Sequence, residues 1–125
     1  MTTTATTAEI IAAYGDAWNE KDAAKRAALL DRCWADDGLY CDPTADVRGR
    51  EALSNVIAGM HTQQPGASIV LTSGIDQHHN QVRFAWDFVG ADGKVAISGI
   101  DAGELAADGR IARIIGFWGA PPAKP

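Results

Sequence analysis

The 125-residue chain lacks the features that define several large classes of protein. It has only two cysteines, Cys33 and Cys41, which are too few for a disulfide-built domain and do not have a metal-binding spacing. Lysine and arginine are not clustered anywhere, and 16 acidic residues against 11 basic ones give a net charge of −5. Binding to a phosphate backbone needs a basic stripe, so we expect no nucleic-acid partner.

Long apolar runs and targeting features are missing as well. No stretch approaches the roughly 20 apolar residues of a membrane span, so we expect no membrane partner. The first residues lack the basic start and the apolar stretch of a signal peptide, and this favours a cytoplasmic location. The sequence has no Gly-rich phosphate loop, no metal-ligand cluster and no nucleophile–histidine pair, so we expect neither a cofactor nor a metal.

What the chain does contain is the composition of one globular domain, with 46% hydrophobic and 22% charged residues. Two amphipathic helices are predicted before residue 34. Thr6 and Glu9 have the spacing of a capping box, and Ile10, Tyr14 and Trp18 follow as an apolar stripe. Asp22 can cap a second helix that extends to about residue 33. The inward stripe of this second helix is predicted to be Ala23, Ala27, Leu30 and Trp34.

Residues 36–64 predict a turn, a short strand and a third helix. Asp36-Asp37-Gly38 is typical of a turn, and a strand over 39–42 ends at Pro43. A polar loop then leads to Gly49. The third helix that follows has an apolar face made of Leu53, Val56, Ile57 and Met60.

From residue 67 the hydrophobic period changes from 3.6 to 2, which predicts strands at about 67–77, 81–90, 94–107 and 110–118. Asp-Gly pairs at 92–93 and 108–109 are strong hairpin signals. Three helices followed by an antiparallel meander form an α+β arrangement. We expect a cone-shaped roll, in which a curved antiparallel sheet wraps around the helices and encloses an apolar pocket.

Alternation along the strands assigns their faces. In strand 81–90, Phe84, Trp86 and Phe88 share one face, which must point inward. The last strand is apolar on both faces near its end, so one face is expected to cover the pocket. The other, with Ile111, Ile115 and Phe117, is expected to form a homodimer contact.

Asp101 is an acid in an otherwise apolar row of strand 94–107, with Gly99 and Gly103 on either side. Glycine weakens a strand unless space or a bend is needed, and an isolated buried carboxylate tends to take up a proton. In the alternative interpretation Asp101 faces water on a surface strand. Its apolar companions favour burial.

Asp42 and Tyr14 are the other two unusual residues. Asp42 ends a short strand directly before Pro43, although Asp-Pro is also an ordinary turn pair. Tyr14 lies on a buried helix stripe, where its hydroxyl needs a partner, and a backbone carbonyl would serve equally well. One phenol and two acids are therefore predicted to point inward.

The three histidines are candidates of lower rank, and their role is left open. His78 and His79 fall at a strand end or hairpin turn, where exposure is expected. His61 lies near the end of the third helix and could face the mouth of the pocket.

The order of these elements resembles the nuclear transport factor 2-like superfamily, in its SnoaL-like polyketide cyclase and ketosteroid isomerase branch. The matching segments are AYGDAWNEKD, CWADDGLYCDP, VRGREAL and GIDAGELAADGRI, in the right order. The resemblance covers residues 8–118 and implies one domain there. Residues 1–7 and 119–125 are then expected to be flexible segments.

Within this branch the site is most similar to that of ketosteroid isomerase. The resemblance implies that Asp42 is the general base, and that Tyr14 and a protonated Asp101 form the oxyanion hole. It implies a cofactor-independent proton-transfer enzyme, isomerase-like or polyketide cyclase-like, on a small apolar carbonyl compound. The alternative is a non-catalytic domain that binds a small hydrophobic ligand. The pocket is expected to be lined by Trp18, Trp34, Tyr40, Val56, Met60, Phe84, Trp86, Phe88 and Trp118.

The sequence also departs from the isomerases. Ile57 lies near the position of a supporting tyrosine in some of them, and Trp86 replaces a small aliphatic residue, which predicts a smaller cavity. Limonene epoxide hydrolases, a related branch, use two aspartates bridged by an arginine. Arg83 and Asp87 fit that pattern poorly because they lie on the face opposite Phe84.

Overall fold

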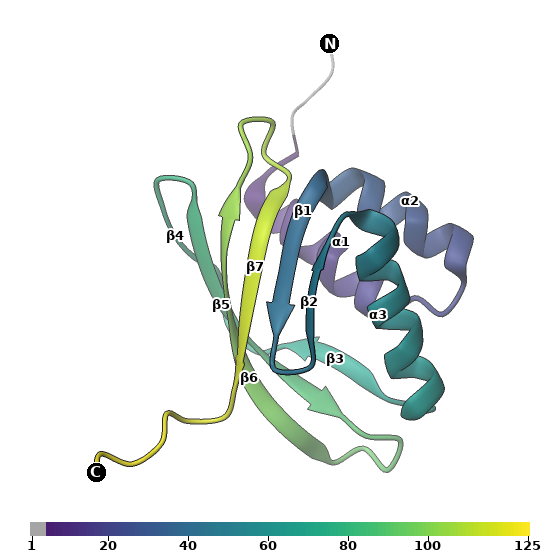
Figure 1. The fold of residues 1–125 in the computed structure, drawn as a ribbon, viewed down its shortest axis with the longest axis vertical. Helices are drawn as coiled ribbons and strands as arrows, with labels where there is room; N and C mark the ends of the chain where they lie inside the picture. The colour runs from purple at the N-terminus through teal and green to yellow at the C-terminus, as the bar shows by residue number, and fades with distance from the viewer. Residues whose placement is uncertain (1–4) are drawn as a thin grey trace.

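A computed structural model describes residues 5–125 and shows three helices packed on one side of a curved sheet (Figure 1). The helices are α1 (Thr7–Asn19), α2 (Ala23–Cys33) and α3 (Arg50–Gln63). The sequence predicts a flexible segment over residues 1–7. Residues 1–4 lie outside the described residues, and α1 begins at Thr7, the last residue of that segment. No helix in the described part is long and apolar enough to cross a membrane.

The first two helices begin at the residues that the sequence predicted. The Thr6 hydroxyl accepts a hydrogen bond from the Glu9 amide at 3.2 Å, which confirms the capping interaction that starts α1. Asp22 accepts one from the Lys25 amide at 2.9 Å and caps α2. The α2 helix ends at Cys33, so Trp34 begins a strand and is not the last residue of a helical stripe.

The sheet has seven strands and is open, since its end strands do not pair with each other. The strand order is β2-β1-β7-β6-β5-β3, with β4 paired to β5 beside β3. The strands are β1 (Trp34–Asp42), β2 (Ala45–Arg48), β3 (Ser68–Leu71), β4 (Asp76–His78), β5 (Gln81–Val89), β6 (Val95–Leu105) and β7 (Ile111–Trp118).

The α+β fold class is confirmed, but the expectation of a purely antiparallel sheet is wrong. The sheet is mixed because β1 lies parallel to β7, while the other pairs are antiparallel. Hairpin signals reveal only neighbours in sequence. The pairing of β1 with a strand more than 70 residues later depends on how the whole meander folds back.

Three local predictions also differ from the structure. The turn predicted at 36–38 is an irregular part of β1, where the pairing register with β7 shifts between Trp34 and Leu39. Gly38 is needed there because a Cβ at this position would overlap the Trp34 indole. The polar loop before Gly49 contains β2, and the strand predicted over 67–77 is divided into β3 and β4.

The core lies between the helices and the concave face of the sheet. Ile11, Leu30, Leu53 and Ile57 are fully buried there. Ile111, expected on the outer face, also belongs to this core. A register shift at the start of β7 inverts the alternation, so Ile111 points inward while Phe117 remains exposed.

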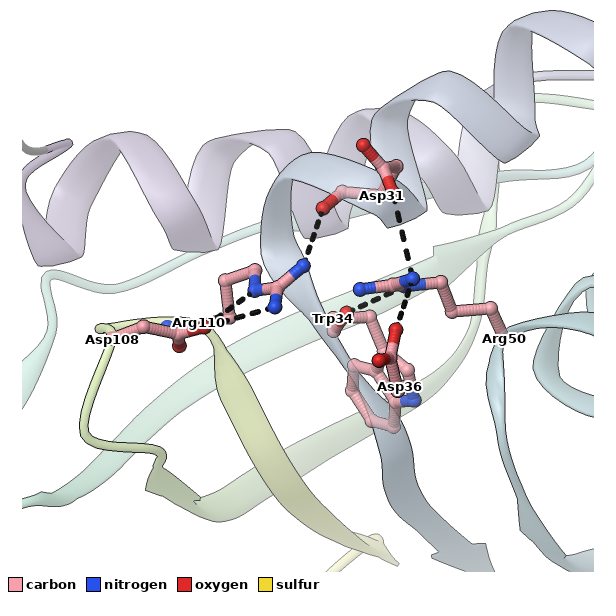
Figure 2. Close-up of polar contacts among 6 residues, drawn as sticks. All are labelled: Asp31, Trp34, Asp36, Arg50, Asp108 and Arg110. Carbon is pink, nitrogen blue, oxygen red and sulfur yellow. Dashed lines mark hydrogen bonds and ion pairs between the residues drawn. The ribbon is translucent and has the colours of Figure 1, made fainter.

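Two arginines fix the start of β1 (Figure 2). Arg50 donates from Nε to the Trp34 carbonyl at 2.8 Å and pairs through Nη1 with Asp36 at 2.5 Å. Arg110 donates to the Asp31 carbonyl at 3.1 Å and thereby joins the β6–β7 turn to the end of α2. The aspartates around them are open to solvent and paired, so this cluster is structural and holds Trp34 in place.

Candidate functional site

A pocket of about 560 Å³ lies between the concave face of the sheet and helices α1 and α3. Its wall includes every site residue predicted from the sequence except Trp34. These lining residues are Tyr14, Trp18, Tyr40, Asp42, Val56, Met60, Phe84, Trp86, Phe88, Asp101 and Trp118.

Trp34, predicted to line the pocket, lies behind its wall. The side chain is fully buried, and its ring stacks on that of Tyr14 with centroids 5.6 Å apart and planes 14° from parallel. The prediction fails because Trp34 starts β1 rather than ending α2, which turns it into the core. Trp34 therefore does not touch the pocket and can affect a ligand only by fixing the position of Tyr14.

Tyr14 comes from the buried face of α1 and is 2% exposed. Burial raises the pKa of its hydroxyl well above the usual value, and the negative charge of Asp101 raises it further. The edge of Phe84 packs against the ring at 6.3 Å. Tyr14 thus stays protonated at any physiological pH and can donate a hydrogen bond into the pocket.

Asp101 lies in the middle of β6 and is 5% exposed, which answers the question of whether it faces water. The Trp86 indole donates from Nε1 to Asp101 Oδ1 at 3.0 Å. Burial raises the pKa of Asp101 to about 7. The indole hydrogen bond opposes this rise, the charge of Asp42 adds to it, and the Tyr14 hydroxyl lowers the pKa by the smallest amount. Near neutral pH the carboxyl can therefore exist in either protonation state.

Two glycines make this arrangement possible. Gly99 pairs with Trp86 across the sheet, and a Cβ on Gly99 would overlap the indole ring. Gly116 pairs with Asp101 from β7, and its Cβ would lie 2.8 Å from Asp101 Oδ1 and 3.6 Å from the Asp42 Cβ. The two acids therefore lie on either side of Gly116, close enough for each to influence the other's charge.

Asp42 is held at the end of β1 by four donated hydrogen bonds. Oδ1 accepts from the Thr44 amide at 2.7 Å, the Thr44 hydroxyl at 2.8 Å and the Ala45 amide at 2.9 Å. Oδ2 accepts from the Tyr40 hydroxyl at 2.5 Å. These four donors fix the orientation of the Asp42 carboxyl at the mouth of the β1–β2 turn. Burial and this bond to Asp42 raise the pKa of Tyr40 far above its usual value.

The histidines lie away from the pocket wall. His61 Nε2 is 2.8 Å from the Trp18 carbonyl and joins α3 to α1, instead of facing the pocket mouth as the sequence allowed. His78 and His79 are exposed at the β4–β5 turn. Between residues 5 and 125 no group of three His, Cys, Asp or Glu side chains could hold a metal ion.

Several lining residues were missed by the sequence reasoning. Asn55, Gly59 and Gln63 form a stripe at i, i+4 and i+8 beside the apolar face of α3, and that spacing could have revealed them. Thr44 and Ala45 were missed because β2 was interpreted as loop. Gly116 is not a lining residue but lies between the two acids, and it gave no local signal because this position depends on the register between β6 and β7.

Three helices and a curved mixed sheet around an internal pocket define the nuclear transport factor 2-like, ketosteroid isomerase-like class of fold. Within it, the SnoaL-like domain model matches residues 11–114. The chain belongs to the SnoaL-like family.

Solved structures support this assignment. A candidate isomerase of the SnoaL-like family from Agrobacterium tumefaciens str. C58 is 32% identical with a TM-score of 0.83, over 89% of this chain and 95% of that one. A protein of unknown function with a cystatin-like fold, from Methylobium petroleophilum PM1, is 22% identical with a TM-score of 0.77; the match covers 98% of this chain and 81% of that one. A protein with a ketosteroid isomerase-like fold from Catenulispora acidiphila DSM 44928, in complex with trimethylamine, is 18% identical with a TM-score of 0.70; the match covers 89% of this chain and 85% of that one. No curated protein matches the sequence.

Proposed function

We propose that the protein is a cofactor-independent proton-transfer enzyme, ketosteroid isomerase-like or polyketide cyclase-like, acting on a small apolar carbonyl compound. The supporting observation is the pair of carboxyl groups on either side of Gly116 in one pocket. Four hydrogen bonds orient Asp42, and burial raises the pKa of Asp101 to about 7, so Asp101 can hold a proton near neutral pH. An oriented carboxyl beside one that can donate a proton suits acid–base chemistry. The 32% identical protein from A. tumefaciens is a candidate isomerase, and this supports the isomerase-like form of the proposal.

Each residue then has a distinct role. Asp42 removes a proton from the carbon next to the carbonyl and returns it to another carbon of the same substrate. Tyr14 and neutral Asp101 donate hydrogen bonds to the carbonyl oxygen, which becomes negative as the enolate forms. Such a donor can contribute roughly 3–4 kcal/mol to the transition state.

The alternative function is a non-catalytic domain that binds a small hydrophobic ligand in the same pocket. One observation favours it: the hydrogen bonds that Asp42 accepts from Thr44 and Ala45 also close the β1–β2 turn, so its carboxylate has a structural reason to be there. The discriminating experiment is an assay with an activated β,γ-unsaturated ketone. An enzyme isomerises it to the conjugated ketone, whereas a binding domain gives no turnover. Native mass spectrometry of the purified protein would identify a retained ligand.

Trp86→Phe should move the pH dependence of this activity. The change keeps an aromatic ring but removes the indole N–H, whose hydrogen bond lowers the pKa of Asp101 in the wild-type protein. That pKa should therefore rise above about 7. Activity needs neutral Asp101 and falls as pH rises through this pKa, so the alkaline limb of the rate profile should move to higher pH.

Carboxyl NMR titration measures the same pKa without turnover. Trp118→Phe is the matched control, because it removes an indole N–H from the same pocket wall and Trp118 makes no bond to Asp101. A lower or unchanged pKa in Trp86→Phe would contradict the role given to the indole.

The outer face of the sheet is expected to form a homodimer. Phe117 is 66% exposed and Ile100 45%, and these two residues pair across β6 and β7. Exposed apolar side chains that gather on one face favour association. Light scattering at micromolar concentration should give twice the monomer mass, and Phe117→Asp should restore the monomer. A monomeric wild-type protein would refute this proposal.

A cytoplasmic location and the absence of a nucleic-acid partner stay predictions.

A further inference from the structure

The charged groups on the pocket wall all have the same sign. Among residues 5–125, Asp42 and Asp101 are the only charged residues that line the pocket, and no lysine, arginine or histidine lines it. Neither acid forms an ion pair within residues 5–125. The hydrogen bonds that they accept come from neutral groups, namely an indole, a phenol, a hydroxyl and backbone amides. The pocket therefore has uncompensated negative charge.

The rest of the wall is mostly apolar, with several aromatic rings and the neutral polar side chains of Thr44, Asn55, Gln63 and Gln64. The Trp18 and Tyr40 rings lie 5.5 Å apart with planes tilted by 50°, and Tyr40 contacts Asp42 through its hydroxyl. Trp86 contacts Asp101 in the same way through its indole nitrogen. Aromatic faces attract cations through their quadrupole, and the attraction grows where water is excluded. Each carboxyl therefore contacts the polar edge of an aromatic side chain in a pocket whose ring faces can attract positive charge.

We propose that this pocket binds small tertiary or quaternary ammonium ions, with the charge between Asp42 and Asp101 and the alkyl groups against the aromatic rings. A ligand of this class supplies the countercharge that the described pocket wall does not provide, and a carboxylate or phosphate ligand is repelled. The inference shares the pocket with the proposed function but rests on its charge and not on the reaction.

Binding should depend on pH in a defined direction. The titratable groups near Asp101 are Asp42 and Tyr40 from β1 and Tyr14 from α1. Strand β5 presents the neutral indole of Trp86, and β7 presents Gly116. A cation favours the ionised form of Asp101, whose pKa in the free protein is about 7. Affinity for an ammonium ion should therefore rise as pH increases through 7, with release of a proton on binding.

The experiment compares choline with 3,3-dimethylbutan-1-ol, its uncharged isostere, by titration calorimetry at about pH 5.5 and pH 8. Because the two ligands have the same shape, their difference reports charge alone. At pH 8 choline should bind at least about tenfold more tightly, which corresponds to roughly 1.4 kcal/mol. The anion 3,3-dimethylbutanoate should not bind. Equal affinity of choline and its isostere, or no binding of choline, would overturn the proposal.

Substitutions of single carboxyl groups show which of them give choline its advantage over the uncharged isostere. Asp101→Asn should remove the pH dependence, and Asp42→Asn should reduce the advantage of choline at both pH values. Asp87→Asn makes the same charge change on the outer face of β5, where Asp87 accepts a hydrogen bond from Ser98, and should leave binding unchanged. Thermal unfolding checks that each variant is folded. An advantage of choline that survives in both pocket variants would refute the proposed site. Calorimetry needs no turnover, so failure of the proton-transfer proposal would be a separate result.

Discussion

Asp42→Asn should lower the turnover of an activated β,γ-unsaturated ketone by roughly 10²- to 10⁴-fold, the usual contribution of a general base. The amide oxygen can still accept the hydrogen bonds from Thr44 and Ala45 that close the turn. The amide nitrogen can donate to the Tyr40 hydroxyl, which accepts as readily as it donates. The variant therefore keeps the size and contacts of the side chain and loses only the base.

Asp46→Asn provides the control for this variant. Asp46 is exposed on β2, opposite Cys41, and does not line the pocket, so its substitution changes the net charge equally without touching the site. Its turnover should match that of the wild type. Affinity for a neutral ligand should change little in either variant. Unchanged isomerisation by Asp42→Asn would place the activity elsewhere in the protein.

Most of the elements could be predicted because their signals are local. The Thr6 capping interaction, the change of period after residue 67 and the Asp-Gly turns depend on residues close together in the chain. The strand pair β1–β7 and the register shift that turns Ile111 inward depend on residues far apart, which no local pattern reveals. Strand β2 was missed because a four-residue strand of mixed polarity resembles a loop.

For the candidate site, the sequence predicted which side chains are buried but not the contacts between strands. Alternation along β6 and the apolar stripe on α1 were enough to predict that Asp101 and Tyr14 point inward, and both are buried. The glycines beside Asp101 indicated that something needs space, but not what fills it. The register places Trp86 opposite Gly99, two residues from Asp101, and this contact between strands turns an isolated acid into a hydrogen-bonded one.

Trp34→Ala should cost about 3–5 kcal/mol of the free energy of unfolding, the usual loss when a buried large aromatic side chain is removed. Trp34 is fully buried and stacks on Tyr14, and the Arg50 guanidinium fixes its backbone carbonyl. The cavity left behind cannot collapse easily, because β1 and α2 meet at this point. Urea unfolding at one fixed protein concentration measures the loss, since the proposed dimer would make stability depend on concentration.

Trp118→Ala separates this core role from a role on the pocket wall. Trp118 is 38% exposed near the end of β7, so its removal should cost about 1 kcal/mol or less. If Trp34 contributed mainly as a pocket residue, the two variants would lose similar stability, and that result would contradict the core assignment. A second readout follows from the stacking on Tyr14. Under conditions where Trp34→Ala remains folded, Tyr14 loses the surface that fixes its ring, so kcat should fall more than KM changes.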